Sequence, residues 1–259
     1  MTRNALNYSG SVGLNYRPLP GLEIGGQFAR SHRNPTVEEL YANGVHLGAG
    51  VYESGNPNLK DEVGHGGDLF VNWANDRISV ELAGFINYFR NFIVFQPTGL
   101  VHEASGFSIF EYQGDEARLI GSEIQANFQL TDNFGLGAGL DYVIGHRISD
   151  ITNGENLPFI PPFRFSTEFE YNIGNAWFGG QVRAVAKQDR VAPEEEITDG
   201  YLLLGFIAGY RLDFKGRHVL ILRADNVLNA SYRDHLSRME DRNLLMPGRD
   251  LSLVYRWFF

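Results

Sequence analysis

The chain closes on a run in which every second residue is apolar or aromatic. Leu251, Leu253, Tyr255, Trp257 and Phe259 alternate with other residue types up to the last position. A period of two predicts a β-strand with one apolar face. The last residues of soluble proteins are usually polar and frayed, whereas an outer-membrane barrel ends on a strand that faces lipid. This segment therefore predicts a membrane-spanning strand.

The same alternation recurs along the chain. It predicts about eleven strands, while no run approaches the roughly 18 apolar residues that a membrane helix requires. The strands are expected at 6–16, 22–28, 62–73, 78–95, 112–130, 134–147, 162–172, 176–187, 200–213, 217–228 and 248–259. The fold class is therefore all-β, and we expect an antiparallel transmembrane barrel segment.

The connections between these strands alternate between short and long. Short breaks are expected at 17–21, 74–77, 131–133, 172–175 and 213–216, and long ones at 31–61, 96–111, 148–161, 188–199 and 229–247. Barrels of the outer membrane have tight periplasmic turns and extended external loops. Aromatic residues flank the short breaks, as an interfacial girdle would; they are Tyr16, Trp73, Phe128, Phe134, Tyr171, Trp177, Tyr210 and Trp257.

The opposite face of the strands is polar, as in Ser79 and Glu81 between Ile78, Val80 and Leu82. A water-filled lumen explains this pattern, but a soluble sandwich or propeller that binds ligands would alternate in the same way. That soluble all-β binding module stays open as an alternative, as does a general porin. The long loops at one end and the terminal aromatic residues favour the membrane barrel.

Composition and motifs exclude several functions. The net charge of -9 argues against a nucleic-acid partner, because phosphate binding needs concentrated Lys and Arg. Cysteine is absent, so thiolate chemistry and disulfides are excluded. No GxSxG or HExxH motif and no set of Ser and His residues suggests catalysis, so we expect no enzyme.

Eleven strands leave two unpaired edges, whereas bacterial single-chain barrels have even strand numbers. No charged and then apolar signal peptide precedes Tyr8. We therefore expect residues 1–259 to be the C-terminal part of a longer barrel, without its plug domain or signal peptide.

Several motifs resemble those of TonB-dependent outer-membrane receptors, in the order of that family and over nearly the whole chain. They are Arg33-Asn-Pro-Thr-Val-Glu-Glu-Leu-Tyr41, Gly55-Asn-Pro-Asn-Leu-Lys-Asp-Glu62, Gly121-Ser-Glu123, Ile160-Pro-Pro-Phe-Arg164, Ala224-Asp-Asn-Val-Leu-Asn-Ala-Ser-Tyr232 and Pro247-Gly-Arg249. The resemblance implies the second half of a barrel of about 22 strands in the outer membrane. It implies as partners the outer-membrane lipid, the missing N-terminal barrel half and plug, and the energy-coupling protein TonB.

The resemblance also implies a ligand class, the uptake of a scarce metal or metal complex. The loop from Glu39 to Glu53 and the segment from Arg233 to Arg249 look most like the zinc-uptake branch, although Val45 stands where that branch commonly has Pro; a ferric-siderophore receptor is the alternative. No resident cofactor is implied. The expected substrate-binding residues are His46, Tyr52, Glu53, His102, Glu103 and His235, of which His46, His102 and His235 are the expected metal ligands, with His146 and Asp150 in or beside the same loops.

Zinc prefers imidazole and carboxylate ligands, yet no pair of these histidines has a tight ligand spacing such as HxxxH. Four further residues are expected to serve structure at the lumen face or the rim. They are Glu123, Arg164, Asn226 and Arg249.

Overall fold

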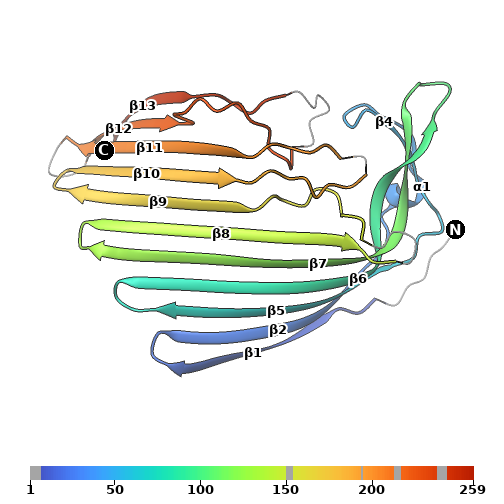
Figure 1. The fold of residues 1–259 in the computed structure, drawn as a ribbon, viewed down its shortest axis with the longest axis horizontal. Helices are drawn as coiled ribbons and strands as arrows, with labels where there is room; N and C mark the ends of the chain where they lie inside the picture. The colour runs from blue at the N-terminus through green and yellow to red at the C-terminus, as the bar shows by residue number, and fades with distance from the viewer. Residues whose placement is uncertain (1–6, 150–153, 194, 213–216, 238–243) are drawn as a thin grey trace.

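The computed structural model describes residues 7–149, 154–193, 195–212, 217–237 and 244–259. It forms one curved sheet in which eleven strands lie side by side in chain order, each antiparallel to its neighbours (Figure 1). These strands are β1 (Gly10–Leu19), β2 (Leu22–Arg33), β5 (Glu62–Ala74), β6 (Ile78–Val101), β7 (Ser108–Thr131), β8 (Phe134–Arg147), β9 (Arg164–Ile173), β10 (Ala176–Val185), β11 (Tyr201–Arg211), β12 (His218–Asp225) and β13 (Asp250–Trp257). The expected all-β class is confirmed, and the eleven strands of this path match the expected number, while two further short strands bring the sheet to thirteen.

Tight turns join consecutive strands at one end of the sheet, on the left of Figure 1, where the C-terminus also lies. Gly21 takes a left-handed φ of 78° in the β1–β2 turn, and Gly174 takes 57° in the β9–β10 turn. A Cβ on Gly21 would lie 2.0 Å from the carbonyl oxygen of Ala74, so this turn requires glycine. The break expected at 213–216 lies outside the described residues.

The strand register sorts the side chains into rows of one kind. Ile24, Val71, Leu82, Ile124 and Leu140 oppose one another directly across five strands and form a continuous apolar row. Many residues of this face are open to the surroundings, since Leu69 is 72%, Leu253 67% and Trp257 60% exposed. A sheet in water would bury such a face, whereas a barrel wall presents it to lipid.

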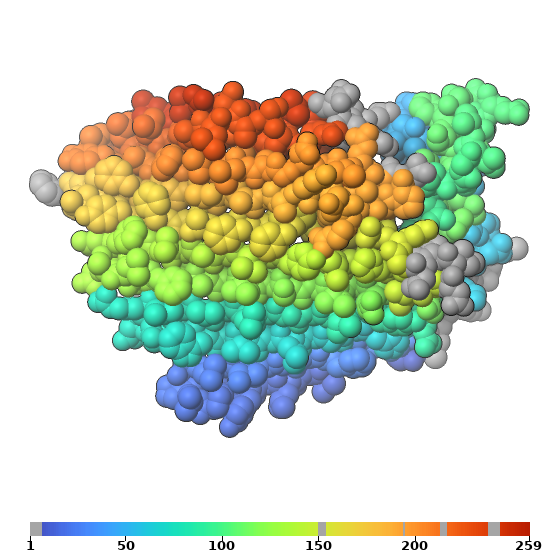
Figure 2. Space-filling view, in the orientation of Figure 1, coloured from blue at the N-terminus to red at the C-terminus, as the bar shows by residue number. Residues whose placement is uncertain are grey.

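Figure 2 shows the strands as contiguous bands that cover the length of the sheet. The small buried core lies at the loop end, where Val94 and Ala117 pack with Leu157 and Ile160. Leu157 and Ile160 belong to the β8–β9 connection and lie against Gly145, where a Cβ would come within 3.0 Å of both side chains. This connection is therefore fixed to the sheet. In the described part of the chain, no helix is long and apolar enough to cross a bilayer.

Two of the expected long loops carry regular structure. The 31–61 segment contains the helix α1 (Val37–Tyr41) and a hairpin of β3 (Asn43–His46) and β4 (Val51–Ser54). The 96–111 segment is mostly a continuation of β6 and β7, which rise together at the right of Figure 1. β4 pairs with β7 in parallel, an exception to the expected antiparallel pattern.

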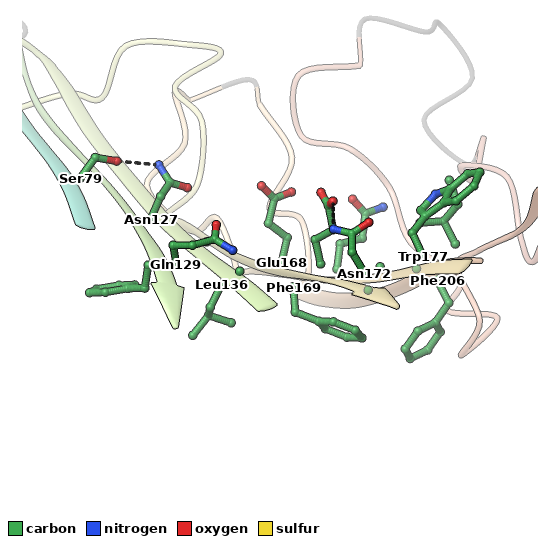
Figure 3. Close-up of a pocket in the computed structure, with 18 of the residues that line it drawn as sticks. Ser79, Asn127, Gln129, Leu136, Glu168, Phe169, Asn172, Trp177 and Phe206 are labelled. Carbon is green, nitrogen blue, oxygen red and sulfur yellow. Dashed lines mark hydrogen bonds between the residues drawn. The ribbon is translucent and has the colours of Figure 1, made fainter. Parts of the chain in front are cut away.

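The expectation that Trp177 belongs to a lipid-facing aromatic girdle is wrong. Trp177 opposes Asn172 on β9 and Gly209 on β11, and it shares its face with Gln181 and Arg183. Figure 3 shows its ring on the same side of the sheet as Glu168 and Asn172, opposite Phe169 and Phe206. The ring lies over Gly209, so the polar face holds this tryptophan.

Candidate functional site

The α1 helix anchors the β3–β4 hairpin to the sheet. Thr36 and Glu39 form a reciprocal capping box at the start of the helix. Arg33, at the end of β2, donates to both carboxylate oxygens of Glu39 at 2.9 Å and to Glu62 of β5 at 3.1 Å. The hairpin is thus held beside the rim by a forked arginine contact.

One face of the hairpin carries an imidazole and a carboxylate in contact. His46 Nδ1 lies 2.6 Å from Glu53 Oε1. The Glu53 side chain is 11% exposed and that of His46 is 54% exposed. The hydrogen bond that His46 donates to Glu53, followed by the negative charge of Glu53, raises the pKa of His46. A buried carboxylate therefore presents an accessible imidazole at the loop end of the sheet.

The other face of the hairpin carries an aromatic stack. Tyr52 and His102 lie with ring centroids 3.9 Å apart and planes at 16°. Tyr52 donates to Asn43 Oδ1 at 2.7 Å, and His102 Nδ1 lies 2.8 Å from Ser105 Oγ. Because Tyr52 and Glu53 are consecutive in β4, their side chains point to opposite faces. His46 and His102 are therefore on different sides of the hairpin, with Glu103 exposed beside the stack.

His235 lies apart from both pairs, in a contact among loops. Its Nδ1 is 3.0 Å from Thr198 Oγ1 and its Nε2 is 3.2 Å from Glu195 Oε1. Glu195 also accepts from the backbone N–H groups of Phe159 and Ala192. Burial raises the pKa of Glu195, but its hydrogen bonds from His235, Phe159 and Ala192 outweigh burial and leave it below the ordinary value.

These contacts join three external connections. Gln188, which is fully buried, donates to the carbonyl of Ile160 at 2.7 Å. Glu195 and Thr198 belong to the β10–β11 connection, Phe159 and Ile160 to the β8–β9 connection, and His235 to the β12–β13 connection. We call Gln188, Glu195, Thr198 and His235 the loop clasp.

Within the ranges that the structure describes, no group of three or more His, Asp or Glu residues is placed to hold a metal ion. The expected ligands His46, His102 and His235 stand in three separate surroundings. His146 lies on the apolar face of β8, and Asp150 falls outside the described residues. The pairing of His46 with Glu53 is the contact in which two expected site residues meet as possible ligands.

The four residues that were expected to serve structure lie on the polar face and at the rim. Glu123 opposes Asp141, which accepts from Arg164 at 2.7 Å. Asn226 takes a φ of 46° and donates to the carbonyls of Ala230 and Pro247. The backbone N–H of Arg249 donates to Asn229. Asn226 and Asn229 thus tie the two ends of the β12–β13 connection together.

An open hollow of about 800 Å³ lies on the polar face near the tight turns. Figure 3 shows Gln129, Glu168 and Asn172 on its side of the sheet and Leu136, Phe169 and Phe206 on the other. Glycines such as Gly137, Gly179 and Gly205 line its floor. The polar face therefore offers room close to the backbone of β8, β10 and β11.

The sequence matches the family described as TonB dependent receptor-like, beta-barrel over residues 2–230. The chain belongs to this family. The match covers most of the strands that form the sheet, and it agrees with their antiparallel order and tight turns at one end.

Solved structures share the fold. The copper transporter OprC is similar with a TM-score of 0.82 and 22% identity, over 97% of this chain and 39% of that one. The ferric enterobactin receptor PfeA of Pseudomonas aeruginosa (mutant G324V) gives 0.68 and 18%, over 97% and 40%. The FrpB iron transporter of Neisseria meningitidis gives 0.71 and 16%, over 96% and 39%. The chain thus spans about two fifths of the transporters and receptors that it resembles.

Proposed function

We propose that this chain forms part of an outer-membrane receptor that imports a scarce metal ion or metal complex, with zinc as the preferred cargo. Family membership and the lipid-compatible face support the receptor class. The observation that carries the choice of a metal is the contact of His46 with Glu53 at the loop end.

Imidazole and carboxylate are ligands that Zn²⁺ prefers. The pair supplies two of the roughly four ligands of a tetrahedral zinc site, which leaves positions for water or for a carrier of the metal. Incomplete coordination by the protein suits a receptor, because the cargo must leave again. The same ligands bind Cu²⁺, the metal of OprC by its name, so copper is a second candidate.

The complete receptor requires more than this segment supplies. Since the chain spans about two fifths of the receptors it resembles, we propose that further barrel strands and a plug complete the wall and fill the lumen. TonB is the proposed energy-coupling partner. Uptake of a ferric siderophore is the alternative cargo, favoured by the aromatic stack of Tyr52 on His102, which suits a flat aromatic ligand.

Calorimetry on the full-length receptor tests the cargo. His46→Ala should raise the dissociation constant for Zn²⁺ by about tenfold or more, the lower range of what losing a metal-site partner costs. His218→Ala is the control, because His218 lies beside Tyr255 near the tight turns and should leave zinc affinity unchanged. Unchanged zinc affinity in His46→Ala, together with tight binding of ferric enterobactin, would replace zinc by the siderophore alternative.

A further inference from the structure

A row of polar and cationic side chains crosses the apolar face of the sheet near its loop end. Arg30 of β2 opposes His65 of β5, which opposes Tyr88 of β6. Tyr88 opposes Arg118 of β7, which opposes His146 of β8. These five residues, which we call the basic row, are direct neighbours across five adjacent strands.

The change from apolar to basic is abrupt. The row two residues nearer the tight turns is apolar or glycine on all five strands, and it consists of Phe28, Gly67, Ile86, Ile120 and Ile144. Ile86 is 49% exposed and Phe28 54% exposed, so this apolar row is open to the surroundings. The basic row therefore borders directly on lipid-compatible surface.

The distance of the basic row from the tight turns fits the thickness of a bilayer. Trp73 and His65 share the apolar face of β5, with Trp73 beside the tight turn. They are eight positions apart, which is about 27 Å along a strand and about 21 Å across the membrane at a tilt of about 40°. An outer-membrane barrel has an apolar band about 25 Å tall, so the basic row lies near the outer boundary of the hydrocarbon.

The charge at this boundary is positive. Arg90, one level beyond Tyr88 on the same face of β6, is exposed and so is Arg118. Neither arginine makes an ion pair within the described residues. Arg30 stacks on the ring of Tyr8 at 3.7 Å. Glu116, two residues beyond Arg118 on the same face, is the nearest acidic residue on β7.

We infer that the basic row, with Arg90, binds the phosphate groups of a lipid in the outer leaflet of the membrane. Guanidinium groups match phosphate oxygens with two parallel hydrogen bonds. A soluble anion or an acidic protein would meet isoleucines immediately beside the cations. A phosphorylated lipid has an acyl region next to its charge and so matches both rows. The inference rests on the proposed membrane location but not on the proposed metal cargo.

Native mass spectrometry and a binding titration with the full-length receptor test the inference. The probe is diphosphoryl lipid A, and monophosphoryl lipid A should bind the unmodified protein more weakly. The double variant Arg90→Gln with Arg118→Gln removes two surface cations. It should therefore weaken binding of diphosphoryl lipid A about 30-fold. Arg183→Gln with Arg256→Gln removes the same charge from the polar face and should leave lipid affinity unchanged.

Three results would overturn the inference: equal lipid affinity in the outer double variant and the parent, equal loss in both double variants, or displacement of lipid A by millimolar inorganic phosphate. The comparison of the two lipids needs no substitution, so it stands even where a variant fails to assemble. Zinc titration of the same samples separates this result from the cargo, because the outer double variant should keep its zinc affinity.

Discussion

At the scale of single residues, the contact with Glu53 should be visible in the titration of the His46 imidazole. The carboxylate favours protonated imidazole, so the pKa of His46 is raised above its ordinary value. NMR titration should place the midpoint of His46 above about 6.5, and Glu53→Gln should return it toward that value. A midpoint that does not respond to Glu53→Gln would contradict the contact.

The sign of the pH effect follows from the direction of this shift. A raised pKa in the folded state means that the contact stabilises the hairpin fully below the unfolded-state pKa and loses that effect as the pH rises through the raised value. Zinc binding has the opposite dependence, because the metal must displace the proton. Zinc affinity at His46 should therefore increase as the pH rises through the same midpoint.

Sequence reasoning reached these residues only one by one. His46 and Glu53 flank the Gly48-Ala49-Gly50 turn, a signal from which their pairing could have been predicted. The stack of Tyr52 on His102 could not, because it depends on the parallel pairing of β4 with β7. The polar facing of Trp177 was available from sequence, since Gln181 and Arg183 share its parity in β10.

At the scale of elements, the loop clasp makes three external connections behave as one unit. Breaking a buried polar contact leaves its partner unsatisfied, which costs about 1 to 3 kcal/mol. His235→Ala should therefore speed amide hydrogen exchange in residues 154–161 and 195–199 together. His46→Ala, on a separate hairpin, should leave both segments unchanged.

Exchange that accelerates only beside residue 235 would show that the three connections move independently. Such a result would also return His235 to the role of a ligand rather than a clasp residue. The Glu195→Gln variant provides a second test, since it removes the negative charge that faces His235 and replaces one of the two acceptor oxygens, which accept from Phe159 and Ala192, by an amide NH2 group.

Strands with clean alternation could be predicted from sequence, and their ends agree with β5, β8 and β10 to within a few residues. The extension of β6 and β7 could not, because Pro97, Gly99 and Gly106 interrupt the pattern there. The strands β3 and β4 have four residues each, and an alternating pattern of that length is too short to be recognised in the sequence. Tertiary pairing, not local preference, sets these elements.

At the scale of the whole molecule, the two faces of the sheet determine what the protein can be. One face carries apolar rows that are exposed over most of the strand length, and the other carries Glu81, Glu123, Glu168 and the polar hollow. A barrel wall with lipid outside and water or plug inside accounts for both. The proposed cargo and lipid contacts lie at the loop end of this wall.

Spin labels at single introduced cysteines test this facing most directly, since the chain contains no cysteine of its own. In the membrane-embedded receptor, labels at Leu82 and Ile86 should be accessible to oxygen dissolved in lipid and shielded from a water-soluble nickel relaxant. Labels at Glu81 and Ala83, on the same strand, should lack the oxygen accessibility. Equal or reversed accessibility at the two pairs would contradict the account.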